Sequence, residues 1–265
     1  MCELLGMSSR VPTTLHRSMT ELARHGGETG PHRDGWGVGL IEDGDAVVVR
    51  EPAPACASQW LACWQTQAPP AAIAVAHIRR ATQGAPLLRN TQPFARELGG
   101  RVHLFAHNGM LTGIEADPRF GARRFRRVGD TDSEHAFCAL LERLAPLWDG
   151  PLPPLAARHA CVVAFARALG DLGPANFLYT DGDVLFAHGH RRRHDDGELR
   201  APGLHLLCRH CAADADAGVA PAPDQDVTLV ASVPLSAEPW RPLAEGELAV
   251  VRGGRWLSAA EIAAG

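Results

Sequence analysis

The 265-residue sequence contains no lysine, so the 26 residues counted as lysine or arginine are all arginines. Schiff-base catalysis and covalent linkage of pyridoxal phosphate both need a lysine amine, and the phosphate-binding loop of nucleotide hydrolases uses a lysine as well. The sequence therefore excludes these three mechanisms. A coding bias toward Arg, Ala, Gly and Pro is the plainer explanation of the absence, ahead of a demand for the forked donors of arginine.

Long apolar stretches are missing too. No uninterrupted run approaches the roughly 18 residues that a membrane-spanning helix needs, and no basic flank followed by an apolar block marks an export signal. The seven cysteines are odd in number and irregularly spaced, which fits a reducing compartment better than a secreted disulfide framework. We therefore expect a cytoplasmic protein that has no membrane partner.

The chain carries little excess charge, with a net −4 at pH 7 and both signs interspersed. This balance offers no general attraction for nucleic acid, and the short basic patch at residues 123–127 is too small to change that expectation. The sequence is 46% hydrophobic and shows neither an internal repeat nor a long linker. It predicts one globular domain over residues 1–265.

Hydrophobic periodicity predicts both helices and strands. Helical spacing is present in four segments: 18–25, 58–67, 131–148 and 155–172. Thr131 and Glu134 are typical of a capping box at the start of the third of these helices. Short apolar runs predict eight strands: 73–78, 102–107, 176–179, 184–187, 204–208, 227–232, 247–251 and 255–257. Hairpin turns at Asp181-Gly182 and Gly253-Gly254 favour layered α and β structure with mainly antiparallel sheets.

Cys2 directly follows Met1, and removal of the methionine would leave a cysteine with a free α-amine. An α-amine titrates near ~8 and a thiol near ~8.5, so nucleophile and general base would belong to one residue, as in N-terminal threonine hydrolases. Taken alone, the position is more simply explained by a small buried cysteine that happens to stand second.

The segment HIRRATQG at residues 77–84 follows a predicted buried strand. A guanidinium at such a strand end can hold a carboxylate through two parallel hydrogen bonds, which suits the α-carboxylate of an amino-acid substrate. The commoner fate of an Arg-Arg pair is one solvated and one salt-bridged side chain.

Asn108 and Gly109 follow another predicted strand. Asn-Gly between extended runs is typical of a type I′ hairpin turn. The Asn108 amide and the Gly109 N–H could also donate to a developing oxyanion, and the two interpretations are compatible.

Three acids, Asp130, Asp132 and Glu134, fall at the start of the helix predicted over 131–148. Acids there complement the helix dipole and cap free N–H groups. A spare carboxylate could bind an ammonium group instead, and the residues alone leave open which acid is spare.

Taken in order, these segments resemble the class II glutamine amidotransferases, a family of N-terminal-nucleophile hydrolases that begin Met-Cys. The opening MCELLGM, the block HRDGWG at 32–37 and AHNG at 106–109 are most similar to the stand-alone, YafJ-like branch. The resemblance covers residues 1 to about 140 and implies an α+β fold. That fold is a four-layer αββα sandwich of the N-terminal-nucleophile hydrolase type, with two antiparallel sheets between helical layers.

The resemblance also implies roles for individual residues. Cys2 would be the nucleophile with its freed α-amine as base, while Asn108 and Gly109 would form the oxyanion hole. Four residues would contact the substrate or the amine: Arg79 at the α-carboxylate, Asp132 at the α-ammonium, Thr82 in the glutamine pocket and Asp34 near the amine. The sequence departs from the family at three positions, since many members have an aromatic at Arg80 and a histidine at Gln83 and Gln92.

The implied reaction is cleavage of the side-chain amide of glutamine or a γ-glutamyl compound through a cysteine thioester, without metal or organic cofactor. A separate protein could accept the ammonia, because we expect no room for a synthase domain before Gly265. A γ-glutamyl hydrolase of a thiol or glutathione pathway and a catalytically silent binding subunit remain alternatives.

Cys208 and Cys211, with His188, His190 and His194, suggest a metal or redox site of a different class. A lone C-x-x-C pair is weak support, because zinc needs four convergent ligands and the polar loop 191–200 separates the histidines from the cysteines. We expect no metal.

Overall fold

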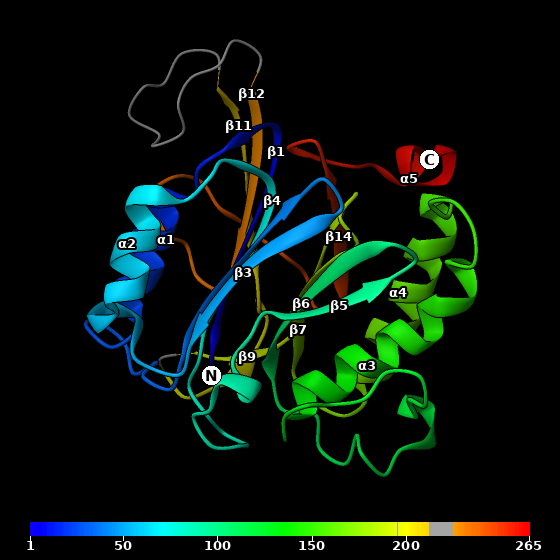
Figure 1. Cartoon of the computed structure of the whole chain (residues 1–265), viewed down its shortest axis with the longest axis horizontal. Helices are drawn as coiled ribbons and strands as arrows, with labels where there is room; N and C mark the ends of the chain where they lie inside the picture. The colour runs from blue at the N-terminus through cyan, green and yellow to red at the C-terminus, as the bar shows by residue number, and fades with distance from the viewer. Residues whose placement is uncertain (195, 212–224) are drawn as a thin grey trace.

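Two antiparallel sheets lie face to face between two layers of helices, as Figure 1 shows. The computed structural model describes residues 1–194, 196–211 and 225–265, apart from the side chain of Cys211. Helices α1 and α2 cover the outer face of one sheet, and α3 and α4 cover the outer face of the other (Figure 1). This arrangement confirms the four-layer αββα sandwich.

The first sheet has seven strands, with the N-terminal strand at its centre. Its order is β13 (Arg241–Pro242), β11 (His205–Cys211), β12 (Gln225–Ala231), β1 (Glu3–Thr13), β4 (Ala71–Ile78), β2 (Trp36–Glu42) and β3 (Asp45–Glu51). Helices α1 (His16–His25) and α2 (Gln59–Gln67) pack on this sheet. Because β1 pairs with β12 on one side and β4 on the other, the chain is held firmly from Glu3 onward.

The second sheet has six strands and lies against the longer helices. Its order is β15 (Arg255–Trp256), β14 (Glu247–Arg252), β8 (Leu185–Gly189), β7 (Ala175–Thr180), β6 (Arg101–Gly109) and β5 (Phe94–Leu98). The helices on this side are α3 (Asp132–Leu144), α4 (Leu155–Gly170) and the short α5 (Ala259–Ala264). A separate ribbon pairs β9 (Arg192–Arg193) with β10 (Leu199–Arg200). Single 3-10 turns lie at Ala55–Ala57, Leu88–Asn90, Pro118–Phe120 and Ala145–Leu147.

Alternation along the strands divides the core into three apolar layers. On β1, Leu4 packs between the sheets, whereas Leu5 faces α1 and α2. On β6, Leu104 and Ala106 pack between the sheets, whereas Phe105 faces α3. Even-numbered residues near these strand ends therefore point into the space between the two sheets.

The predicted elements lie close to the observed ones, with three informative differences. The helix predicted over 131–148 ends at Leu144 and continues as the 3-10 turn Ala145–Leu147, because Pro146 cannot donate an amide hydrogen bond. The capping box forms only in half: Thr131 Oγ1 accepts from the Glu134 amide at 3.2 Å, but the Glu134 carboxylate turns elsewhere. The eight predicted strands do not include β1, β2, β3 or β5, or the two-residue strands β9, β10 and β13.

None of the helices in the described parts of the chain combines the length and the apolar character that crossing a membrane requires.

A buried ion pair fixes α4 to the hairpin between β7 and β8. Arg158, which is 1% exposed, donates to Asp181 at 2.6 Å and to Asp183 at 2.8 Å. Asp181 and Gly182 form the hairpin turn that the sequence predicts. The Asp181 carboxylate also accepts from the amides of Asp183 and Val184, so one acid orders the turn and anchors the helix.

We expect Arg158→Met to destabilise the protein by about 3–5 kcal/mol, because it leaves the Asp181 charge buried without its partner. The comparison is the melting temperature of Arg158→Met against Arg167→Met, which changes an exposed arginine on the same helix. Equal melting temperatures for the two variants would show that the buried pair does not stabilise the fold.

Candidate active site

Cys2 lies at the open end of the central strand β1. The antiparallel register places Glu3 opposite Ile78, the last residue of β4, so Cys2 comes beside the residues that follow β4. Its Sγ lies 3.3 Å from the Arg80 amide nitrogen and 3.4 Å from the Arg80 carbonyl oxygen. The pairing of β1 and β4 thus brings the first cysteine to the segment HIRRATQG.

A narrow polar pocket of about 20 Å³ opens beside Cys2. Its lining includes five of the seven predicted site residues: Cys2, Arg79, Thr82, Gly109 and Asp132. They come from the N-terminus, the loop after β4, the end of β6 and the first turn of α3. The fold therefore gathers residues that lie up to 130 positions apart around the cysteine.

Asn108 is buried close to this pocket, and its side-chain amide has no partner. The residue is 1% exposed, and neither Nδ2 nor Oδ1 finds a hydrogen bond within the described chain. The alternation along β6 directs the Asn108 side chain into the space between the sheets, as it does for Leu104 and Ala106. Leu4 of β1 points into the same space, and Cys2 lies two residues before it. A buried polar group without a partner costs about 1–3 kcal/mol, and such groups in native proteins often serve binding or catalysis.

The hairpin turn predicted at Asn108-Gly109 does not form. Strand β6 runs through both residues, which pair with Asn176 and Ala175 of β7. Long-range pairing with β7 holds the dipeptide extended, and this overrides its local turn preference. Gly109 is required there, because a Cβ atom would lie 1.7 Å from the Pro174 carbonyl oxygen.

Buried polar contacts support the strand beneath the pocket. His107 Nδ1 lies 2.9 Å from Ser133 Oγ, which donates to Asp132 at 3.3 Å. The Gln92 side chain forms two hydrogen bonds with the His107 backbone, donating at 3.2 Å and accepting at 2.6 Å. Burial lowers the pKa of His107, so the ring is neutral, although Asp132 opposes the shift. His107, Ser133 and Gln92 also line the pocket, and their positions in AHNG and TDSE could have indicated the first two.

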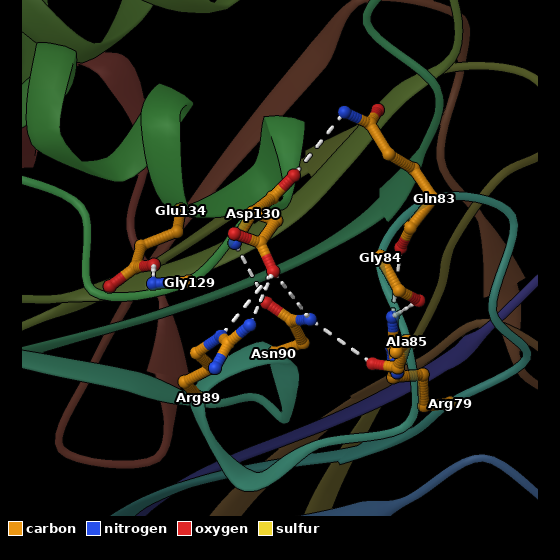
Figure 2. Close-up of polar contacts among 9 residues, drawn as sticks. All are labelled: Arg79, Gln83, Gly84, Ala85, Arg89, Asn90, Gly129, Asp130 and Glu134. Atoms are coloured by element: carbon orange, nitrogen blue, oxygen red, sulfur yellow. Dashed lines mark hydrogen bonds and ion pairs between the residues drawn. The ribbon is translucent and has the colours of Figure 1, made fainter.

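The three acids at the start of α3 have separate partners. Asp130 pairs with Arg89 at 3.1 Å on the surface (Figure 2). Glu134 accepts from the Gly129 amide at 2.6 Å and pairs with Arg96. Asp132 alone lines the pocket beside Cys2. Its Oδ2 accepts from the Leu111 amide at 2.8 Å and its Oδ1 from the Ser133 amide at 2.8 Å, which fixes the carboxylate in place.

Arg79 holds the loop that follows it. Its guanidinium donates to the carbonyl oxygens of Gln83, Gly84 and Ala85 at 2.8–3.0 Å (Figure 2). Asn90 fastens the same loop to the approach to α3, donating to Ala85 at 3.1 Å and accepting from the Asp130 amide at 2.8 Å (Figure 2). Arg79, the expected contact of the substrate α-carboxylate, thus uses three of its five N–H donors to hold its own loop.

Asp34 and Thr82 differ in their relation to the pocket. Asp34 Oδ2 accepts from the Ala81 amide at 2.7 Å, and the Asp34 amide donates to the Arg79 carbonyl at 3.0 Å, so this acid braces the backbone behind the pocket. It lines none of the cavities at Cys2. Thr82 is exposed at the pocket rim.

The surroundings of Cys2 keep its sulfur protonated. Burial raises the pKa of the Cys2 thiol, and the Arg80 backbone hydrogen bond opposes this shift only in part. Met1 precedes it, with its carbonyl oxygen 2.7 Å from His32 Nε2. Burial lowers the pKa of the Met1 amine. A sulfur nucleophile in this place needs a neighbouring base.

The other candidate clusters take structural roles. His188 Nδ1 donates to the Ala175 carbonyl at 2.7 Å, and Cys208 Sγ accepts from Thr228 at 3.4 Å. Within the described residues, no group of three or more His, Cys, Asp or Glu side chains could hold a metal ion, and the Cys211 side chain lies outside them. In the basic patch 123–127, Phe125 is buried and Arg127 pairs with Glu115.

The family model described as "Glutamine amidotransferases class-II" matches residues 1–264. The chain is 38% identical over 248 residues to YafJ of Escherichia coli (strain K12), which is named as a glutamine amidotransferase; the match covers 93% of this chain and 96% of YafJ. The crystal structure of a predicted glutamine amidotransferase from Pseudomonas aeruginosa PA01 matches with a TM-score of 0.69 and 30% identity, covering 97% of this chain and 100% of that one.

Glutamine phosphoribosylpyrophosphate amidotransferase from B. subtilis has the same fold, with a TM-score of 0.61 at 15% identity; the match covers 97% of this chain and 48% of that one. The matches to the family model and to YafJ span most of the sequence and agree with the sandwich that surrounds Cys2. The chain therefore belongs to the class II glutamine amidotransferases and is YafJ-like within that family.

Proposed function

We propose that this protein cleaves the side-chain amide of glutamine or of a γ-glutamyl compound through a thioester on Cys2. The observation that carries the proposal is the buried, unpartnered amide of Asn108, one residue before Gly109, which lines the pocket with Cys2. Donors aimed at the place where negative charge develops are the usual means of stabilising a tetrahedral oxyanion. Gly109, beside Cys2 in the pocket lining, supplies the second donor of the proposed oxyanion hole.

The proposed reaction needs Met1 to be removed, so that the Cys2 α-amine becomes the general base. The amine takes the thiol proton while Sγ attacks the γ-carbonyl carbon. The carbonyl oxygen becomes an oxyanion held by Asn108 Nδ2 and the Gly109 N–H. When the C–N bond breaks, the protonated amine of Cys2 gives its proton to the leaving nitrogen. Water activated by the same amine then releases glutamate from the thioester.

The glutamyl end of the substrate is assigned to the polar pocket. Asp132 is the acid at α3 that lines it, and its fixed carboxylate retains lone pairs for the α-ammonium. Arg79 keeps two N–H donors beyond those that hold its loop. Since the pocket measures only about 20 Å³, the exposed part of this loop, with Thr82 and Gln83, has to move outward to admit a glutamyl group.

We further propose that residues 1–265 form one amidotransferase domain that acts in the cytoplasm without a cofactor. Strands from both ends of the chain support a single unit, because β1 and β13 belong to the first sheet and β5 and β15 to the second. Ammonia released from glutamine would pass to a separate protein. A silent binding subunit is the weaker alternative, because it would gain nothing from the unpartnered Asn108 amide.

Intact-mass measurement tests the first step of the mechanism. We expect active protein to begin at Cys2. While Met1 is attached, the α-nitrogen of Cys2 belongs to a peptide bond and cannot accept a proton as the general base. Cys2→Ala should abolish glutamine hydrolysis and leave the melting temperature unchanged. Full activity in protein whose mass includes Met1 would contradict the mechanism.

We expect Asn108→Ala to lower kcat about 10²- to 10³-fold with little loss of stability, as for removal of one oxyanion donor. Asn176→Ala is the matched control, because Asn176 lies directly opposite and its amide is fully hydrogen-bonded. That variant should lose stability instead. An Asn108→Ala protein with a lowered melting temperature and unchanged kcat would show that Asn108 is only structural.

The charges of the glutamyl group give a third test. We expect N-acetylglutamine, which lacks the α-ammonium, to be cleaved with a kcat/KM at least about tenfold below that of glutamine, because the charge-assisted contact to Asp132 is lost. Asp132→Asn should shrink this ratio, and Arg79→Met should mainly raise KM. Equal cleavage of both substrates by the unaltered protein would remove Asp132 from the binding site.

A further inference from the structure

Two larger cavities lie near the polar pocket: Cys2 itself lines the apolar one, and the basic one adjoins the apolar one. The apolar cavity, of about 230 Å³, is lined by Cys2 and Gly109 together with Met110, Pro174 and Leu199. The basic cavity, of about 710 Å³, has a lining that includes His32, Arg192 and His194. Met1, Arg80 and Arg193 line both of them, so the two cavities meet at these three residues.

Met1 occupies the junction between the two cavities. Its carbonyl oxygen lies 2.7 Å from His32 Nε2, and its sulfur accepts from the Arg193 amide at 2.8 Å. The proposed mechanism requires the removal of this residue. The space that it vacates then joins the apolar cavity to the basic cavity, directly beside the nucleophile.

Neither arginine at the junction forms an ion pair with an acid in the described part of the chain. Within the described residues, the Arg80 side chain has no acidic partner, and the Arg193 guanidinium donates to the neutral Gly197 carbonyl at 2.5 Å. The acid in the basic cavity lining is Glu3, and its carboxylate is engaged by His25 at 2.8 Å. Among the described residues, the two arginines therefore line this space without pairing with an acid.

We propose that this junction is a subsite for a leaving group that carries a carboxylate, so that the preferred substrates are γ-glutamyl derivatives of apolar amino acids. The inference rests on the proposed function. Cys2 lines both the polar pocket and the apolar cavity, so a substrate with its glutamyl end in the first extends its amine portion into the second. Free ammonia needs none of this space.

The chemistry of the lining matches such an amine portion. The carboxylate of the departing amino acid lies toward Arg80 and Arg193, whose planar donors suit it. Its apolar side chain packs on Met110, Pro174 and Leu199. Hydrolysis breaks the γ-carbonyl C–N bond, places the hydroxyl of water on the carbonyl carbon and a proton on the nitrogen, and releases glutamate and the free amino acid.

The test compares three substrates on protein shown by mass to begin at Cys2: glutamine, γ-glutamyl-leucine and γ-glutamyl-isoamylamide, which is the leucine compound without its carboxylate. We expect kcat/KM for γ-glutamyl-leucine to exceed that for the isoamylamide by at least about tenfold, as for a charge-assisted contact. Arg80→Met and Arg193→Met should each bring this ratio toward one. Arg126→Met changes an exposed arginine that lines none of these cavities and should leave the ratio as it is.

Other outcomes separate the two proposals. Equal cleavage of the leucine and isoamylamide compounds, or a ratio that neither site variant alters in folded protein, overturns the subsite. Cleavage of glutamine without cleavage of γ-glutamyl-leucine overturns the subsite and leaves the proposed function in place. If correctly processed protein cleaves none of the three, both proposals fail.

Discussion

The position of the candidate site depends on one constraint: β1 is hydrogen-bonded along both of its edges, to β4 and to β12. A strand between β4 and β12 cannot shift its register without breaking two ladders and turning its apolar residues to the wrong faces. Cys2, one residue before this strand, is therefore held against the Arg80 backbone. The second sheet packs across the same core, and the alternation along β6 and β1 directs Asn108 and Cys2 toward the side of Leu104, Ala106 and Leu4. The proposed roles of Cys2 as nucleophile and Asn108 as oxyanion donor would need this rigidity, because catalysis loses efficiency steeply with small errors of position.

Periodicity in the sequence predicted helices α1 to α4 and eight of the strands, because an apolar face is visible in the local sequence, but it did not predict β1 at the centre of the first sheet. The hairpin at Asp181-Gly182 is an example of a correct prediction, because its turn residues and flanking runs agree. Asn108-Gly109 shows the limit: the same kind of turn signal is overruled by β7, a strand 66 residues farther along that local rules do not see. Likewise, no local rule could tell that Asp132 lines the pocket while Asp130 and Glu134 pair with Arg89 and Arg96.

Because the chain has no lysine, arginine is its only side chain with a permanent positive charge. Burial and local contacts determine the role of each arginine. Arg158 is fully buried with two carboxylates and stabilises the fold. Arg79 is buried and donates to loop carbonyls, which orders the segment around the pocket. Arg80 is exposed at the junction of the cavities. The motif HIRRATQG alone did not separate the last two roles, because the distinction depends on where β4 ends relative to Cys2.

Met1 links the two proposals physically. While it is present, it blocks the amine that the mechanism needs and fills the place where the apolar and basic cavities meet. It forms hydrogen bonds through its carbonyl oxygen and its sulfur and lies outside both sheets, so its removal leaves the strand ladders intact. In the two proposals, loss of this single residue therefore creates the base and opens the leaving-group side together. Both effects act on Cys2 without rearranging the fold, because β1 begins only at Glu3 and its ladders do not include Met1.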